Sequence, residues 1–267
     1  MRSLINAGIT CYQSQGDADY HICNTATDLA CGTDRAVILV GKDTDLLTML
    51  IDRSKPNLFM QYARNAIYGI DCMKEALHPN VRTHLLATHA ISGSDTVSAI
   101  YNVGKKKALK VLEQEVWEAL SVFKKVDATH EEIAAAAEMF VLKLYNANHL
   151  TTSLDILRYV HYMRKMKTST SSFQLQSLPP TSAAVKFHVF RAFFAVQEWL
   201  GNPANLQPTD WGWELHDVML IPVYTDRPLA PQSVLRMVSR GCKTGYAKRC
   251  KCRKAGLDCS AMCSTCA

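Results

Sequence analysis

The sequence predicts an α/β fold in which a parallel sheet with flanking helices is followed by a helical region and a small zinc-binding tail. Two observations indicate the body: short apolar runs alternate with helical patterns up to residue 80, and helical patterns alone follow. Such alternation is typical of a parallel sheet that is covered by helices. A third observation indicates the tail, because six of the ten cysteines lie after residue 240.

Three strands and two helices are expected in the first part of the chain. The apolar run at 36–40 is short, rich in β-branched residues and bounded by turn residues, as a buried strand is. Ligands of a parallel sheet bind at the carboxyl ends of its strands, which is where Asp43 and Asp45 fall. The predicted strands are 8–12, 36–40 and 58–63, and the predicted helices are 17–30 and 43–51.

The rest of the body is predicted to be helical, because apolar residues recur along it at intervals of three or four. A loop rich in Ser, Thr and Pro is expected at 168–180, and an irregular connector at 203–231. The predicted helices are 83–91, 96–101, 105–123, 131–146, 153–166 and 183–200. We expect a division into domains at 1–125, 126–235 and 240–267.

Charge is distributed unevenly between body and tail. The chain has 30 basic and 24 acidic residues, and the segment 240–267 holds seven of the basic ones and one of the acidic ones. The body is therefore neutral, and the tail, which carries the net charge of +6, favours a polyanionic partner such as DNA. No apolar run approaches the roughly 20 residues of a membrane span, and the first residues lack a signal-peptide stretch. We expect a nuclear protein with no membrane segment.

Five aspartates form three groups beside small residues. Carboxylates at the ends of buried strands repel one another unless a cation neutralises them, and hard oxygen ligands suit Mg²⁺ or Mn²⁺. The alternative is that Asp17, Asp43 and Asp95 only cap the helices that follow them. The five candidate metal ligands and catalytic residues are Asp17, Asp19, Asp43, Asp45 and Asp95.

The order Gly-acid-Ala-acid, strand-Gly-x-Asp-x-Asp and Gly-x-Asp resembles the 5′-nuclease superfamily of flap endonucleases, whose nuclease domain is PIN-like. The resemblance covers roughly residues 8–125. It implies that the five aspartates hold two ions for phosphodiester hydrolysis by a metal-activated water. The segment 102–108 resembles the family's helix-hairpin-helix turn, with Asn102 in place of the first glycine, and asparagine tolerates a left-handed backbone. The resemblance implies that DNA phosphate is bound by Gly104, Lys105, Lys106 and Lys107, although the three lysines also fit a solvated helix face.

The chain departs from this family in one respect that concerns the site. The family places another metal-binding aspartate on its first strand, with a helical arch after it, before the acidic pair that Asp17 and Asp19 match. Only sixteen residues precede Asp17 here, so we expect an N-terminally incomplete domain: a fragment, a mis-predicted gene model or a domesticated remnant. Weak metal binding and weak or absent cleavage are expected.

The tail combines closely spaced cysteines with basic residues and almost no large apolar residues. Zinc binding would supply the folding energy of such a segment, and free thiols are the alternative. The run 250–259 resembles the tesmin-type CXC domain, a DNA-binding module, and one or two zinc ions are expected. PIN-like body and CXC-like tail together resemble transposon-associated proteins of invertebrates. The expected zinc ligands are Cys242, Cys250, Cys252, Cys259, Cys263 and Cys266, and the expected DNA contacts are Lys248, Arg249, Lys251, Arg253 and Lys254.

Other candidate ligands are interpreted as structural. The histidines, His84 and His89 among them, are taken as core or surface groups, and the four cysteines of the body as buried apolar residues. Three functions stay open. The first is a DNA-binding protein with an incomplete nuclease-like domain, the second an active Mg²⁺-dependent structure-specific nuclease, and the third a non-catalytic scaffold that binds a protein partner through 183–231.

Overall fold

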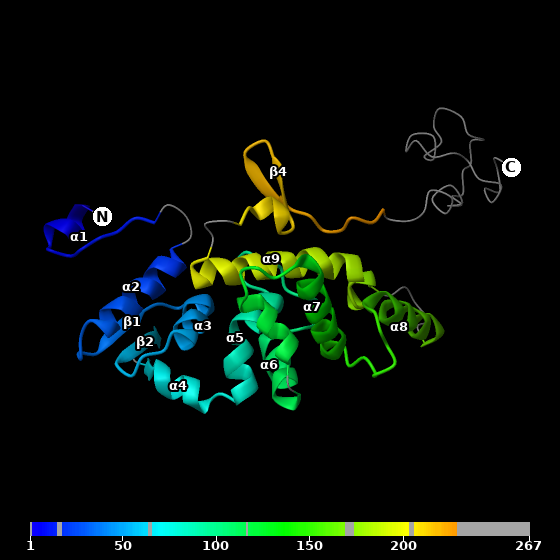
Figure 1. Ribbon diagram of the computed structural model, residues 1–267, viewed down its shortest axis with the longest axis horizontal. Coiled ribbons are helices and arrows are strands. Elements are labelled where there is room, and N and C mark those ends of the chain that lie inside the picture. Colours follow the sequence, from blue (N-terminus) through cyan, green and yellow to red (C-terminus); the bar gives the residue numbers. More distant parts are fainter. Residues whose placement is uncertain are drawn as a thin grey trace. The chain divides into compact units, whose positions relative to one another are not determined.

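The structure is a computed structural model that describes residues 2–14, 18–63, 66–115, 117–168, 174–202 and 206–228. The chain divides into two compact units, Met1–Tyr224 and Thr225–Ala267. The first unit is a mixed α/β structure that is mostly helical and has a small mixed sheet (Figure 1). The predicted zinc ligands and basic DNA contacts of the tail lie outside the described residues, as does Asp17.

The sheet has three strands in the order β1-β2-β3, which are Val37–Val40, Leu58–Ala63 and Ala66–Gly69. Strands β1 and β2 are parallel, as predicted, whereas β2 and β3 are antiparallel. The prediction of a purely parallel sheet is therefore wrong. Only residues 64 and 65 separate β2 from β3, and a parallel neighbour requires a crossover of a dozen or more residues.

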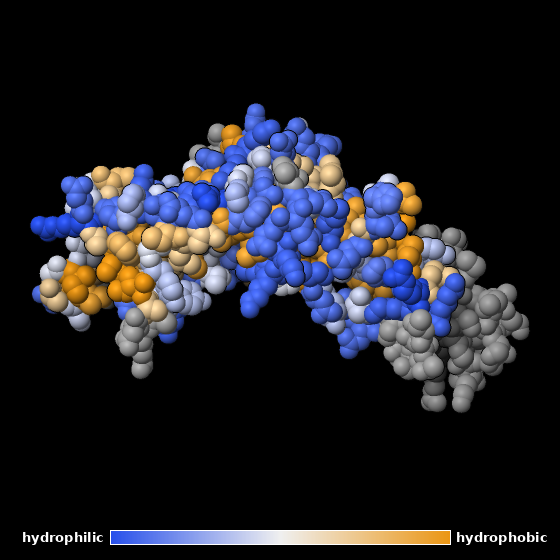
Figure 2. Space-filling view, turned by 90° about the horizontal axis from the view of Figure 1, so that it is seen from below, coloured by the Kyte–Doolittle hydropathy of each residue, from blue (hydrophilic) through white to orange (hydrophobic). Residues whose placement is uncertain are grey.

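The predicted strand at 8–12 is not formed. Residues 9–12 have no regular structure, and the side chains of Ile9 and Tyr12 are exposed, so no burial favours an extended pairing there. Among the described residues, β1 pairs only with β2, and Val40 on its free edge is 74% exposed. Figure 2 shows exposed apolar side chains (orange) at the end of this unit that contains the sheet.

Most helices lie close to their predicted positions. The region 96–101 is a loop instead of a helix, and the predicted helix 105–123 is broken at Glu115, whose backbone is extended. The break lets Trp117 pack edge-on against Phe140, with ring centroids 5.2 Å apart. The helices are α1 Arg2–Asn6, α2 Asp19–Cys31, α3 Thr44–Asp52, α4 Ile70–Ala76, α5 Pro79–Ile91, α6 Lys105–Gln114, α7 His130–Leu144, α8 Leu154–Thr168 and α9 Ser182–Leu200, with short 3₁₀ segments η1 Glu118–Lys124, η2 Leu175–Ser177 and η4 Pro208–Asp210.

The predicted irregular connector contains a hairpin of β4 (Trp213–His216) and β5 (Met219–Pro222). Arg191 of α9 fixes this segment, because its Nη1 donates to the carbonyl oxygens of Gly212 at 3.0 Å and Val223 at 2.6 Å. Trp211 is buried, and the centroid of its ring lies 4.5 Å from that of Phe193.

Helix α9 runs through the middle of the first unit and packs against α5 and α7 (Figure 1). Its side chains belong to one buried core that continues from Cys23 of α2 to Trp211, so residues on both sides of position 125 share it. Of the four cysteines in the body, only Cys23 is buried, and Cys31 and Cys72 are exposed, contrary to expectation. Among the described residues, no helix is both long and apolar enough to cross a membrane.

Candidate metal site

Two helices begin beside the carboxyl end of β1. Helix α3 starts after Asp43, whose Oδ1 accepts a hydrogen bond of 2.8 Å from the backbone N–H of Asp45. Helix α2 starts at Asp19, and Cys23 on its next turn donates from Sγ to the carbonyl oxygen of Leu46 at 3.6 Å. This packing of α2 on α3 brings three carboxylates together. One oxygen from each of Asp19, Asp43 and Asp45 lies within 4.8 Å of the other two.

The three carboxylates fit a divalent cation by their chemistry. Carboxylates this close repel one another, and the positive ends of α2 and α3 offset only part of that repulsion. Asp45 is 5% exposed, whereas Asp19 and Asp43 are half-buried, so solvent reaches the cluster. A group of hard oxygen donors that is open on one side is the kind of site that Mg²⁺ or Mn²⁺ occupies.

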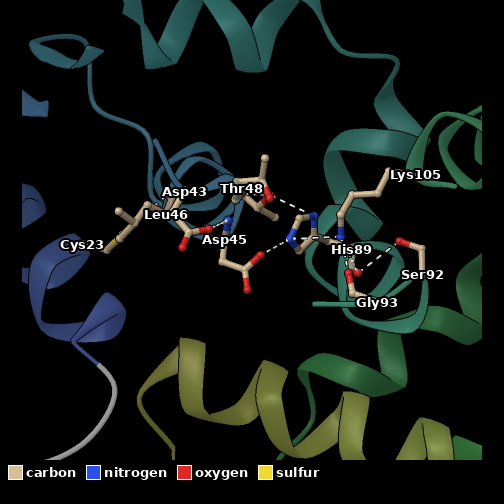
Figure 3. A network of polar contacts seen from close by, with 10 residues as sticks. Cys23, Asp43, Asp45, Leu46, Thr48, His89, Ser92, Gly93 and Lys105 are labelled. Atoms are coloured by element: carbon tan, nitrogen blue, oxygen red, sulfur yellow. Dashed lines mark hydrogen bonds and ion pairs between the residues drawn. The ribbon is translucent and has the colours of Figure 1, made fainter. Parts of the chain in front are cut away.

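A histidine that the sequence pattern marks only as structural lies directly against this cluster. His89 of α5 is buried, and its Nε2 is 2.5 Å from Oδ1 of Asp45 (Figure 3). Its Nδ1 lies 3.3 Å from Oγ1 of Thr48. The view of His89 as an ordinary core residue is thus incomplete. No spacing motif points to it, because its contact with Asp45 depends on how α5 packs against α3.

Lys105, the first residue of α6, points into the protein instead of toward solvent. Its Nζ donates to the carbonyl oxygens of His89, at 3.2 Å, and of Gly93, and lies 3.3 Å from His89 Nε2 (Figure 3). Its ammonium group is thus engaged by carbonyl oxygens of the protein, and its contact with a DNA phosphate, which the helix-hairpin-helix resemblance implies, stays a prediction. Burial lowers its pKa, while the charges of Asp45 and Asp95 act in the opposite direction.

Asp45 is kept ionised by its neighbours. Burial alone would raise its pKa, but the hydrogen bond and charge of His89, the backbone N–H of Asp95 and the charge of Lys105 together hold the pKa below its ordinary value. Asp45 therefore stays negative throughout the neutral range. A negative carboxylate is the form that binds a cation.

The structure brings together three of the five predicted ligands. Asp95 lies in the loop after α5, where its side chain is exposed and its backbone N–H hydrogen-bonds to the Asp45 carboxylate. Asp95 thus supports a ligand of the cluster through its backbone, while Asp17 is not described. His89 and Lys105 are the residues of this site that sequence reasoning placed elsewhere.

The turn before α6 has one feature that the sequence predicts correctly. Asn102, which stands where the resembled motif has glycine, adopts a left-handed backbone with φ of +57°. Gly104 caps α6 without a side-chain hydrogen bond and is exposed, as is Lys106. Lys107 lies over the ring of Tyr145 at 5.7 Å. Contact of this turn with DNA stays a prediction.

Comparison with protein family models, curated proteins and solved structures gives no match to this chain. Its function is therefore inferred from the chemistry of the site and from the distribution of charge along the chain.

Proposed function

We propose that this chain is a nuclear DNA-binding protein whose first unit retains the divalent-metal site of a degenerate, PIN-like 5′-nuclease domain. The observation that carries the proposal is the cluster of Asp19, Asp43 and Asp45, with oxygens within 4.8 Å of one another at the starts of two helices. The parallel pairing of β1 with β2 supports it, because Asp43 and Asp45 follow the carboxyl end of β1.

The residues that would hold Mg²⁺ or Mn²⁺ are the three clustered aspartates. A bound divalent cation would supply charge neutralisation at a phosphodiester and activation of water for its hydrolysis. The chain's own groups prepare this site: Asp43 is fixed by its cap hydrogen bond, and Asp45 by His89. Because only three carboxylates converge in the described residues, we expect metal binding with weak or absent cleavage.

The test is a titration of the full chain with Mn²⁺ in which electron paramagnetic resonance measures the bound ion. Asp43→Asn is the informative variant, since asparagine caps a helix as well as aspartate does but lacks the charge. We expect the wild type to bind Mn²⁺. The affinity of Asp43→Asn should be lower by about tenfold or more, because one of three anionic ligands is lost. Asp34→Asn, at an exposed acid before β1, is the control. Equal affinity in wild type and Asp43→Asn would contradict the metal site.

The same proteins distinguish the second candidate function, an active nuclease. The clustered carboxylates are the reason to keep it, since they are the ligand type that metal-dependent phosphodiesterases use. A flap DNA and a nicked duplex are incubated with Mg²⁺ or Mn²⁺. Fast cleavage that Asp43→Asn abolishes would establish the enzyme, whereas binding without cleavage agrees with the first proposal.

The tail completes the proposal as the DNA-anchoring and zinc-binding part of the chain. Its support is compositional: the segment 240–267 carries the entire net charge and six cysteines. One or two zinc ions held by those cysteines would order the segment. Its basic residues would then meet phosphates of the duplex.

A further inference from the structure

We propose that His89 is a positioning residue of the metal site, which holds Asp45 through its Oδ1 and so fixes the orientation of this carboxylate toward the ion. The inference rests on the proposed metal site and adds a specific role for a residue that is not among the carboxylates. It is carried by the contacts that Asp45 and His89 make with each other and with their surroundings.

The first step concerns Asp45. Both partners are 5% exposed, so neither group is served by bulk water. A buried carboxylate without hydrogen bonds is costly, and His89 Nε2 lies within hydrogen-bonding distance of Oδ1, at 2.5 Å. Facing a carboxylate, Nε2 is the donor. Oδ1 is therefore held in place by the ring, and the carboxylate keeps lone pairs for a cation.

The second step concerns what holds the imidazole ring. The hydroxyl of Thr48 donates to the carbonyl oxygen of Thr44 at 2.8 Å, and its oxygen lies 3.3 Å from Nδ1 of His89. The ring of Trp199 lies against the imidazole with centroids 5.8 Å apart. Contacts from α3 and α9 thus restrict rotation of the ring, and Asp45 is held by a fixed donor.

The third step distinguishes positioning from direct coordination. Nε2 is already engaged by Asp45, and the ammonium group of Lys105 lies 3.3 Å from the same nitrogen. Lys105 is anchored there by the carbonyl oxygens of His89 and Gly93. A second cation at Nε2 would be repelled by this ammonium group. The ion is therefore expected on the side of Asp45 that faces Asp19 and Asp43, away from the histidine.

The test compares two polar replacements in the full chain. In His89→Gln, the side-chain amide nitrogen reaches about the place of Nε2 and can donate to Asp45. In His89→Asn, the shorter side chain replaces only the Nδ1 end. Loss of an outer-shell partner typically weakens metal affinity about 10- to 100-fold. We expect that loss for Mn²⁺ in His89→Asn and a change of a few-fold at most in His89→Gln.

The control is His84→Asn, because His84 is on the same helix and is equally buried, at 5% exposed. Its Mn²⁺ affinity should equal that of the wild type, which separates the effect of the Asp45 contact from that of any buried polar replacement in α5. Thermal unfolding of all variants reports whether each is folded. If His89→Asn does not fold, the Mn²⁺ affinity of His89→Gln is compared with that of His84→Gln instead. We expect both affinities to be close to that of the wild type.

Pulsed electron paramagnetic resonance of bound Mn²⁺ supplies a readout that a merely structural role would not give. We expect no coupling from a directly bound nitrogen, in wild type or variants. Strong ¹⁴N coupling would make His89 a ligand and overturn the positioning role. Wild-type affinity in His89→Asn, or His89→Gln as weak as His89→Asn, would also overturn it while leaving the metal site intact. Absence of Mn²⁺ binding by the wild type would instead remove the metal site and this role with it.

Discussion

His188 illustrates how a titratable residue is kept neutral inside the helical part of the molecule. It lies on α9, and its Nε2 donates to the carbonyl oxygen of Ile91 at 2.8 Å. Burial is the largest influence on the ring and lowers its pKa from 6.5 to about 4, although the carbonyl acts in the opposite direction. Protonation of His188 would place a charge in the core between α5 and α9, which burial disfavours.

The lowered pKa of His188 predicts that the folded protein loses stability on mild acidification. In the unfolded chain His188 takes up a proton near pH 6.5, whereas the folded protein does so only near pH 4. The unfolded state therefore binds more protons between these values, and the free energy of unfolding falls as the pH is lowered from 6.5 to 4. The shift corresponds to a loss of roughly 3 kcal/mol.

Urea unfolding at several pH values measures the effect. His188→Gln keeps a donor near the place of Nε2 but cannot titrate, so its stability should fall less over the same range. His84 and His161, whose pKa values burial also lowers, contribute equally to both proteins and cancel in the comparison. Identical slopes for wild type and variant would show that His188 is not the group responsible.

At single residues, the sequence predicts what depends on local chemistry. Asp43 and Asp45 are predictable because they follow an apolar strand, and Asn102 because asparagine tolerates positive φ. His89 and Lys105 are not predictable in this way. Their contacts join α3, α5 and α6, and no pattern along the chain encodes how those helices pack.

At the scale of elements, the loop between α5 and α6 connects the site to the rest of the unit. Gly93 has φ of +110°, and a Cβ atom there would lie 2.8 Å from Cα of Ala99. The carbonyl oxygen of Gly93 accepts from Lys105, and the N–H of Asp95 supports Asp45. A backbone change at Gly93 therefore affects both the stability of the loop and the support of the acidic cluster.

Gly93→Ala should destabilise the protein by about 1–3 kcal/mol, because alanine disfavours this φ and would collide with backbone atoms of the same loop. Gly104→Ala is the matched control at the other end of the loop, where φ is −86° and a Cβ atom would have no neighbour within 4 Å. It should cost less than about 1 kcal/mol, the difference between two weak helix caps. Chemical denaturation measures the free energy of unfolding of both variants. Equal losses of stability would show that the backbone conformation of Gly93 does not require glycine.

Element prediction succeeds here for the long helices and fails for three of the short strands. Helices α7, α8 and α9 are 15 to 19 residues long and are found from their apolar spacing. Strands β3, β4 and β5 have four residues each, too few for a clear alternation. The hairpin of β4 and β5 also depends on Asp217, which adopts φ of +54° in its turn. Asparagine or aspartate at such a position is recognisable only once the flanking strands are known.

At the scale of the whole molecule, the net charge belongs to the end of the sequence and not to the first unit. The residues up to 239 contain 23 basic and 23 acidic side chains, and the segment 240–267 adds the net charge of +6. Near the cluster, Lys105 is turned inward, which leaves Lys106 as the exposed lysine at the start of α6. Attraction of the first unit to DNA should therefore be weak compared with that of the tail.

Deletion of residues 240–267 should weaken binding to duplex DNA and flatten its dependence on salt. Each lysine or arginine that meets a phosphate releases counterions and contributes roughly −0.9 to the slope of log affinity against log salt concentration. About five contacts from the tail would give a slope near −4.5, against about −1 to −2 for the truncated chain. Fluorescence anisotropy of a labelled duplex at several salt concentrations measures both slopes.

Lys106→Ala in the full chain is the control and should change the slope by about one contact at most. If the truncated chain bound the duplex as tightly and with the same slope, the first unit would be the DNA-binding part, and the tail would be better explained as the binding site for an acidic protein partner.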